Sequence, residues 1–110
     1  MSIERLTAPG AFDRKRVEMA VRRRKRYRYV KPEVRTIEGG FLIESPCCSR
    51  RVDASGGVIP IALLQQEPEV GWMLYRMDHA VGEWKLYGVY PHLADLLEPL
   101  QLDPERIFWQ

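Results

Sequence analysis

The strongest constraint on the fold is a series of short apolar segments separated by residues that favour tight turns. Gly39 and Gly40 separate the first two segments, and residues 79–81 separate the last two, so both pairs are predicted to be hairpins. Pro60 indicates that the middle strand lies at an edge or is irregular. The pattern therefore predicts an antiparallel meander of four or five strands. The segments are residues 34–37, 41–45, 58–64, 71–77 and 83–90.

Side-chain pairing predicts a register for the first hairpin. We expect the apolar residues Ile37 and Leu42 to lie opposite each other. The same register places Arg35 opposite Glu44, which joins opposite charges across the two strands. The two glycines between the strands then form a two-residue turn, because glycine accepts the positive φ angles that such turns need.

The second hairpin has two competing registers. One of them opposes Arg76 to Lys85 and so places like charges across from each other, which is unfavourable. The other register opposes Trp72 to Gly88, where a large ring can cover a residue that has no side chain. We therefore expect the second of these registers.

A helical pattern precedes the strands. Residues 11–25 place apolar side chains on one helix face, with Asp13 in the first turn and cations in the last turn, as the helix dipole favours. Continuing the helix would put Arg24 within the apolar face, so we expect the helix to end near that residue. The apolar face consists of Val17, Ala20 and Val21.

A second helical pattern follows the strands. Leucines at positions i, i+3, i+4 and i+7 predict an amphipathic helix that docks on the sheet, and Pro99 limits its length. Asp103 and Pro104 have the cap and the first-position proline of a further short helical turn before an apolar chain end. The leucines of the pattern are Leu93, Leu96, Leu97 and Leu100.

The chain has 110 residues, of which 45% are hydrophobic, and this is enough for one core but too little for two. We expect residues 1–10, which include Pro9 and Gly10, to be a flexible lead-in and residues 11–110 to form a single domain. The predicted class is α+β, with a basic N-terminal helix, the antiparallel meander and a C-terminal helix packed on the sheet. A small Sm-like or SH3-like barrel is the alternative, because a helix leading into a strongly bent sheet fits the same pattern.

Charge is distributed very unequally along the chain. Residues 1–35 contain 12 Lys and Arg residues against 4 Asp and Glu residues, a net charge of +8. Residues 36–110 contain 5 against 11, a net charge of −6. The total of +2 therefore conceals a basic segment on an acidic body, and such a segment either seeks an anionic partner or is neutralised by the body.

The basic run of residues 22–28, with the tyrosine after it, is the candidate functional site. Residues 26–30 alternate Arg and Tyr with a period of two, which predicts a strand with one cationic and one aromatic face. We expect the cations to hold phosphates and the tyrosines to stack on bases, a combination typical of RNA or single-stranded nucleic-acid binding. No sequence-specific binding motif is present, so the predicted binding is non-specific. The candidate residues are Arg22, Arg23, Arg24, Lys25, Arg26, Tyr27, Arg28 and Tyr29.

Three other roles fit the same basic run. The chain could be a protein-interaction or homo-oligomerising module whose basic segment docks on an acidic surface. The run could instead be a solvated face that the acidic remainder neutralises, with its tyrosines in the core. A membrane-surface role is the third alternative. A steep salt dependence of nucleic-acid retention would distinguish the predicted function from these.

No residue pattern indicates an enzyme, a cofactor or a metal site. Cys47 and Cys48 together with His79 and His92 supply the donor types that zinc uses. Zinc sites draw paired cysteines from positions two to four residues apart, and adjacent side chains in an extended chain point to opposite faces. The histidines occupy ordinary positions, a predicted turn and a helix start. We therefore predict a non-enzymatic protein with no cofactor and no bound metal.

The same two cysteines bear on the cellular compartment. Adjacent cysteines do not make a disulfide framework, which agrees with free thiols in a reducing environment. The first 20 residues contain no uninterrupted apolar stretch, and no later segment approaches the 18 apolar residues that span a bilayer. We expect a cytoplasmic protein without a membrane span.

The C-terminal part of the chain, residues 71–110, resembles a known family. Its order is a W-x-L-Y strand in residues 71–75, a second tryptophan-containing strand in residues 82–87, a leucine-rich helix and a D-P-x-x-I-F-W ending in residues 102–109. This order resembles the uncharacterised bacterial family called domain of unknown function 3024. The resemblance implies a small α+β bacterial domain and carries over no active site. The paired cysteines and the basic run are not part of the pattern.

Overall fold

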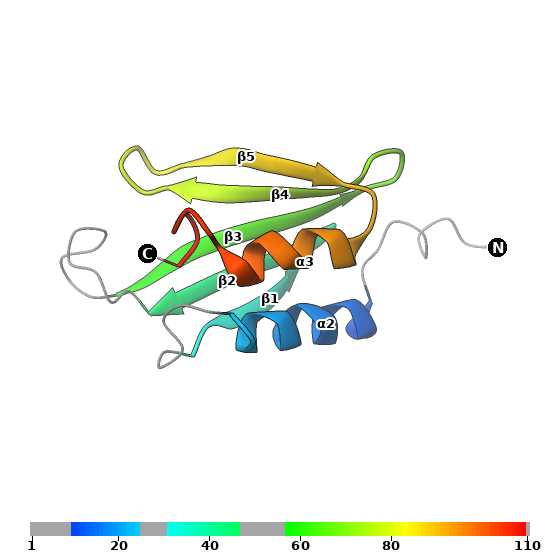
Figure 1. The fold of residues 1–110 in the computed structure, drawn as a ribbon, viewed down its shortest axis with the longest axis horizontal. Helices are drawn as coiled ribbons and strands as arrows, with labels where there is room; N and C mark the ends of the chain where they lie inside the picture. Colours follow the sequence, from blue (N-terminus) through cyan, green and yellow to red (C-terminus); the bar gives the residue numbers. More distant parts are fainter. Residues whose placement is uncertain (1–9, 25–30, 47–56, 110) are drawn as a thin grey trace.

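The structure is a computed structural model that describes residues 10–24, 31–46 and 57–109. The α+β prediction is confirmed, because a helix lies at each end of a five-stranded antiparallel meander (Figure 1). The lead-in predicted for residues 1–10 lies outside the described residues except for Gly10. The elements are α2 (Ala11–Arg22), β1 (Glu33–Ile37), β2 (Gly40–Pro46), β3 (Val58–Glu67), β4 (Gly71–Asp78), β5 (Glu83–Tyr90) and α3 (Leu93–Leu102).

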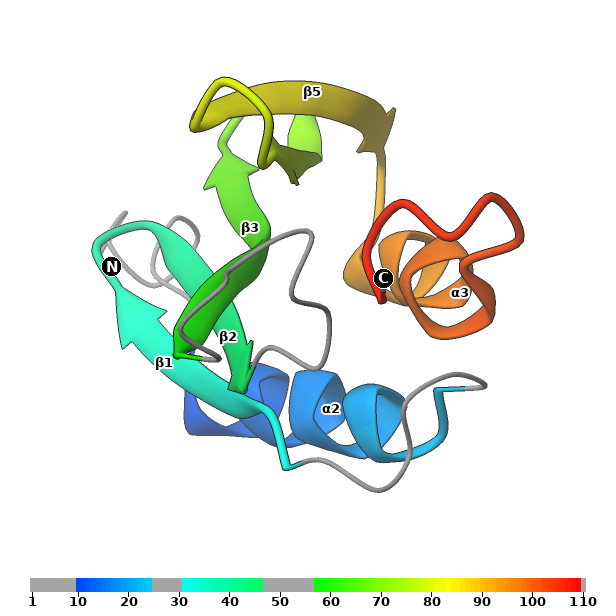
Figure 2. The same ribbon diagram turned by 90° about the vertical axis from the view of Figure 1, so that its left-hand side faces the viewer.

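The five strands form one curved sheet in the order β1-β2-β3-β4-β5, with every neighbouring pair antiparallel. Strands β1 and β5 are its two edges, and within the described residues they do not pair with each other. Figure 2 shows the sheet curling so that β5 and β1 lie on opposite sides of the molecule. The sheet is therefore open, and it does not close into the small barrel that was the alternative prediction.

Both helices pack on the same face of the sheet and share one hydrophobic core with it. Helix α2 lies beside β1, while α3 contacts β4 and β5, and the two helices contact each other (Figure 1). The helices supply the apolar faces that their sequence periods predict, and the chain end adds two aromatic side chains. The core residues are Val17, Val21, Val34, Phe41, Ile43, Ile61, Ala62, Leu64, Trp72, Leu74, Leu93, Leu96, Leu100, Phe108 and Trp109.

The predicted register of the first hairpin is wrong by two residues. Ile37 lies opposite Gly40, and Arg35 lies opposite Leu42. The turn is formed by Glu38 and Gly39, since only Gly39 has a positive φ, of 77°, while Gly40 already belongs to β2. A shift of two residues leaves each side chain on its predicted face. The ion pair between Arg35 and Glu44 therefore still forms, diagonally, at 2.9 Å.

The predicted register of the second hairpin is also wrong, because the turn fixes the register that opposes Arg76 to Lys85. The amides of Val81 and Gly82 donate to the Asp78 carbonyl oxygen at 3.3 and 2.8 Å, which closes a loop of four residues. Arg76 and Lys85 are partly or fully exposed, so water screens their repulsion at little cost.

A β-bulge separates this turn from the far end of the second hairpin. Tyr75 pairs with Leu86 but Leu74 pairs with Gly88, which leaves Tyr87 as the extra residue on β5. Trp72 consequently lies opposite Tyr90 and not opposite Gly88 as predicted. The extra residue places Tyr87 against the chain end, where its ring meets that of Phe108 edge-on with centroids 5.1 Å apart.

Pro60 marks an irregular strand, as predicted, but β3 is the central strand of the sheet and not an edge. The pairing between β2 and β3 shifts at Glu44, which lies opposite Pro60 while the preceding Ile43 lies opposite Ala62. The extra residue, Ile61, forms a bulge next to the proline. A bulge is one of the places where a sheet tolerates a residue that cannot donate a ladder hydrogen bond.

The chain after α3 forms an exposed turn around the buried Asp103 instead of the predicted helical turn. Helix α3 also continues through Pro99 to Leu102. Asp103 is 2% exposed and left-handed, with φ of 42°, and it ends the helix. Its carboxylate accepts hydrogen bonds from the amides of Ile107 at 2.8 Å, Phe108 at 3.2 Å and Trp109 at 2.8 Å. This carboxylate thereby holds the aromatic chain end in the core.

Candidate nucleic-acid interface

Helix α2 has one face in the core and one face toward solvent. Its buried residues are Val17, Ala20 and Val21, as the helical period predicts. Lys15, Arg22 and Arg23 lie on the exposed side. Because α2 is anchored through its apolar face, these three cations are displayed on a fixed scaffold next to the segment that continues the basic run. We call Lys15, Arg22 and Arg23 the cationic face.

Two further cations of α2 are partly neutralised within the helix. Arg14 Nε lies 3.5 Å from Glu18 Oε2, and Arg16 Nη1 lies 3.8 Å from Asp13 Oδ1. These pairs have the i,i+4 and i,i+3 spacings at which side chains on a helix surface meet. The cationic face has no ion pair with any carboxylate in residues 10–24, 31–46 and 57–109.

Arg24, which the sequence analysis grouped with the phosphate-binding cations, is instead in the interior. It is 3% exposed, and its Nη1 donates a hydrogen bond to the Val21 carbonyl oxygen at 2.7 Å. Its guanidinium carbon lies 4.9 Å from the centroid of the Trp109 ring, a cation–π contact. Arg24 therefore fastens the end of α2 to the end of the chain, and we leave it out of the candidate interface. The reason is the turn that follows α2, because the Arg24 amide also donates to the Val21 carbonyl oxygen, at 3.3 Å, and this turn directs the side chain toward the core.

The rest of the predicted site lies outside the described residues. This applies to Lys25, Arg26, Tyr27, Arg28 and Tyr29, and so to the predicted strand of alternating Arg and Tyr. The structure thus gives the position of α2 at one end of this segment and of Lys31, before β1, at the other. The residues that flank the undescribed segment, Arg24 and Lys31, therefore lie close together, because both line the same groove.

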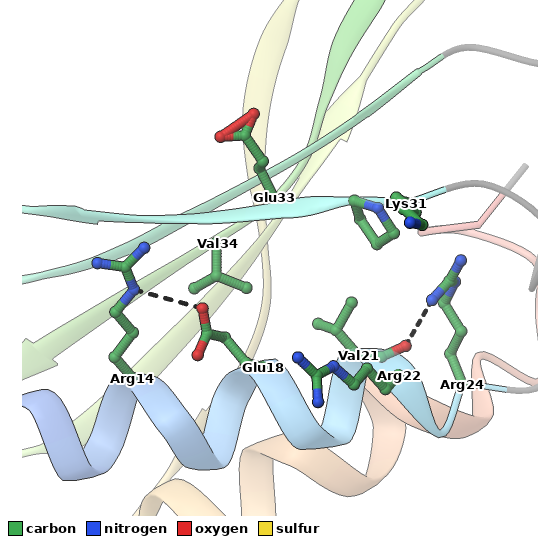
Figure 3. A pocket seen from close by; sticks show the side chains of 9 residues that line it. Arg14, Glu18, Val21, Arg22, Arg24, Lys31, Glu33 and Val34 are labelled. Atoms are coloured by element: carbon green, nitrogen blue, oxygen red, sulfur yellow. Dashed lines mark hydrogen bonds and ion pairs between the residues drawn. The ribbon is translucent and has the colours of Figure 1, made fainter.

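A groove of about 510 Å³ lies between the second half of α2 and the start of β1 (Figure 3). Arg14 and Glu18 lie at one end of the groove, where their ion pair is visible, and Arg24 and Lys31 lie at the other end. The remaining lining residues are Val21, Arg22, Pro32, Glu33 and Val34. The groove thus joins the cationic face to the beginning of the sheet.

Sequence reasoning missed four residues of this surface. Lys15 and Lys31 lie outside the dense run, but helical spacing places Lys15 near Arg22, and the topology returns Lys31 to the end of α2. Phe12 and Met19 also lie on α2 with 77% and 44% of their surfaces exposed. The helical period could have predicted this exposure, because neither Phe12 nor Met19 lies on the helix face that carries Val17, Ala20 and Val21.

The alternative metal and catalytic candidates gain no support. Within the described residues, no group of three or more His, Cys, Asp and Glu side chains could hold a metal ion, and Cys47 and Cys48 lie outside them. His79 lies in the turn between β4 and β5, as predicted, and partial burial lowers its pKa. His92 directly precedes α3, also as predicted. Neither α2 nor α3 is long and apolar enough to cross a bilayer.

Comparison with known proteins gives one match. The profile of the family described as Domain of unknown function (DUF3024) matches residues 7–110, which is essentially the whole chain. The match includes the basic run and the paired cysteines as well as the C-terminal motifs. No curated protein and no solved structure matches the chain.

Proposed function

Since the chain belongs to the DUF3024 family, whose description assigns no activity, we propose its function from the site itself. The proposal is that the protein binds RNA or other single-stranded nucleic acid without sequence specificity. The cationic face contacts phosphates, together with Lys25, Arg26 and Arg28 of the adjoining segment. Tyr27 and Tyr29 stack on bases.

The observation that carries this proposal is that the cationic face has no ion-pair partner among the described residues. Lys15, Arg22 and Arg23 are exposed, and no carboxylate from the described part of the acidic remainder forms an ion pair with them. Closely spaced cations on a fixed helix repel one another, and a polyanion relieves this repulsion while it releases its own counterions. A phosphate backbone supplies such charges at the spacing of successive nucleotides.

The experiment that tests this proposal is a salt series of binding to a fluorescent single-stranded RNA of mixed sequence, followed by fluorescence anisotropy. If only the three described cations contact phosphates, the logarithm of the affinity falls with the logarithm of the salt concentration with a slope of about −2. Additional contacts from the adjoining segment make the slope steeper. Arg23→Gln is expected to make the slope less steep by about 0.7 and to weaken binding to all sequences alike.

Lys85→Gln is the matched control, because it removes one exposed charge from β5, away from α2 (Figure 1). It should leave the affinity and the slope nearly unchanged. Absence of binding even at low salt would remove the proposal. Equal losses for Arg23→Gln and Lys85→Gln would show that only net charge matters, which contradicts a site on α2.

A second candidate function, self-association, is favoured by the exposed apolar residues of α2. Phe12 and Met19 lie among the cations of this helix, whereas the neighbouring α3 exposes the carboxylates of Asp95 and Glu98. Because α2 and α3 lie side by side on one face, two copies related by a two-fold axis could place the basic helix of each on the acidic helix of the other. The exposed apolar side chains would then be covered.

Light scattering over a range of protein concentrations tests this second candidate. The wild-type chain should reach the mass of a dimer, and Phe12→Ser should lower the association strongly. Val58→Ser removes a similarly exposed apolar side chain from the start of β3 and serves as the control. A monomer at every concentration would eliminate self-association.

A further inference from the structure

We propose that the groove between α2 and β1 binds a phosphate monoester of about mononucleotide size. This ligand site is distinct from the cationic face, although the two share Arg22. The proposal rests on the shape of the groove, on the placement of charges along it and on the apolar side chains between them. All of these features are formed by residues 14–24 and 31–34.

The size of the groove fits a small organic ligand. Its volume of about 510 Å³ falls within the range of roughly 300 to 1,000 Å³ that is typical of small-molecule sites. It lies between two elements that the core holds in place, because Val21 on α2 and Val34 on β1 are both buried members of that core. The two walls of the groove that these residues form are therefore part of the folded core.

The charges along the groove favour an anion at one end. Glu18 is paired with Arg14 at 3.5 Å, so these two charges largely cancel. Glu33 extends from β1 on the side away from α2, as Figure 3 shows. Arg22 and Lys31 have no ion pair within the described residues, and both line the groove. They are the cations that a ligand would neutralise.

The Arg24 guanidinium adds positive potential to the same end of the groove while it keeps its structural contacts with Val21 and Trp109. A concave surface lined by charges of one sign concentrates their field and attracts small ions of opposite charge. A phosphate monoester is well suited, because it is compact and nearly doubly charged at neutral pH. Its phosphate can contact Lys31, while the Arg22 guanidinium extends along α2 toward Glu18 and adds positive charge to the middle of the groove (Figure 3). At the other end of the groove, Arg14 and Glu18 neutralise each other, so the ligand needs no charged group there.

The apolar side chains determine what else the ligand carries. Val21, Pro32 and Val34 line the groove between its two ends. An ester with an organic body can contact them, whereas inorganic phosphate cannot. A mononucleotide combines the required phosphate with a sugar and a flat base and has a suitable size. The chemical class is therefore a phosphate monoester with an organic body, and AMP is a convenient probe.

The test is titration of the full-length, ¹⁵N-labelled chain with AMP, adenosine and inorganic phosphate, followed by amide chemical shifts. AMP should cause saturable shifts at Val21, Arg22, Lys31 and Val34, and both adenosine and inorganic phosphate should bind more weakly. Lys31→Gln should weaken AMP binding about five- to tenfold, as expected for the loss of one charged contact. Lys85→Gln, which removes an exposed charge from β5 and outside the groove, should leave AMP binding unchanged.

Several outcomes would overturn the proposal. These are the absence of saturable shifts, shifts that map away from the groove, and equal effects of Lys31→Gln and Lys85→Gln. Inorganic phosphate that binds as tightly as AMP would show that the apolar side chains contribute nothing. The amide spectrum of Lys31→Gln shows directly whether this variant is folded. RNA binding can fail while AMP binding persists, and the reverse, so the two proposals are tested separately.

Discussion

Three consecutive arginines at the end of α2 illustrate how position alone assigns different roles to the same side chain. Arg22 and Arg23 are exposed, whereas Arg24 is 3% exposed and packs on Trp109. Helix α2 ends at Arg22, and the amides of Arg23 and Arg24 donate to the carbonyl oxygens of Ala20 and Val21 in a tight turn that directs Arg24 into the core. The planar guanidinium of Arg24 is suited to this interior position because it can donate hydrogen bonds at its edge and contact a ring with its face.

Arg24→Ala is therefore expected to lower the free energy of unfolding by about 2 to 4 kcal/mol, because a buried hydrogen bond and a cation–π contact are lost together. Arg23→Ala, one residue earlier, should change it by no more than about 0.5 kcal/mol. Urea denaturation followed by tryptophan fluorescence measures both values. Equal effects of the two substitutions would show that Arg24 does not fasten α2 to the chain end.

At the scale of elements, adjacent glycines in the first hairpin have different reasons to be glycine. Gly39 has φ of 77°, and a Cβ there would point into open space. Gly40 has an ordinary strand conformation, but a Cβ there would overlap the backbone carbonyl oxygen of Leu64 on β3. The first glycine thus serves the turn, and the second serves the close approach of β2 and β3.

These two roles predict different costs for substitution by alanine. Gly39→Ala should cost about 1 to 2 kcal/mol, the strain of a left-handed backbone with a side chain. Gly40→Ala should cost about 3 kcal/mol or more, because backbone atoms of two paired strands must separate. Chemical denaturation of the two variants gives the comparison. A larger loss for Gly39→Ala would mean that turn strain, and not strand contact, dominates this hairpin.

Strand β5 carries two tyrosines whose pKa values are raised above the usual 10.0, in both cases mainly by burial. The folded protein thus holds these phenol protons more tightly than the unfolded chain does. Their contribution to stability is complete below pH 10.0 and is lost as the pH rises through the higher folded-state pKa values. For Tyr87, the hydroxyl oxygen also lies 3.5 Å from Glu105 Oε1, and this negative neighbour acts in the same direction.

Replacing Tyr87 by phenylalanine removes the phenol group that titrates. The variant should therefore lose less stability than the wild type in alkaline solution. The measurement is the free energy of unfolding from urea denaturation at a series of pH values on both sides of 10. We expect the curves of the wild type and Tyr87→Phe to run parallel below this pH and to approach each other above it. Parallel curves throughout would contradict a raised pKa for Tyr87.

On the scale of the whole molecule, the D-P-x-x-I-F-W ending closes the core instead of forming a surface element. Phe108 and Trp109 are 1% and 2% exposed, and the Trp109 indole donates a hydrogen bond to the Leu100 carbonyl oxygen at 2.8 Å. The chain end therefore contacts α3 through this bond and α2 through Arg24. Both helices depend on it for their positions against the sheet.

Deletion of residues 103–110 should abolish cooperative folding. Loss of a buried phenylalanine or tryptophan costs about 3 to 5 kcal/mol each, and the total stability of a domain is only about 5 to 15 kcal/mol. Trp109→Phe keeps an aromatic ring and should still fold, with a loss of about 1 to 2 kcal/mol from the indole hydrogen bond. Thermal unfolding followed by circular dichroism distinguishes the two. A sharp transition in the shortened chain would mean that the core is complete without its end.

The charge asymmetry also belongs to this scale. Within the described residues, the N-terminal third and the acidic remainder share the single ion pair between Arg35 and Glu44, on the edge of the sheet. The other ion pairs of α2 are internal to the helix. Within the described residues, the two oppositely charged parts of the sequence thus form little direct ion pairing with each other, and the exposed cationic face is available to an external anion.

The sequence alone determined the helices, the antiparallel meander and the buried faces, because hydrophobic period and turn residues act over a few neighbouring positions. It also selected the basic run, of which Arg22 and Arg23 are exposed. Only the tertiary structure decided the hairpin registers, the burial of Arg24 and the groove beside Lys31. Each of these depends on groups far apart in the chain: a bulge against a neighbouring strand, a ring at the opposite terminus, a strand returning to the end of a helix. Local patterns contain no information on such distances, since it is the packing of the complete core that selects among locally equivalent arrangements.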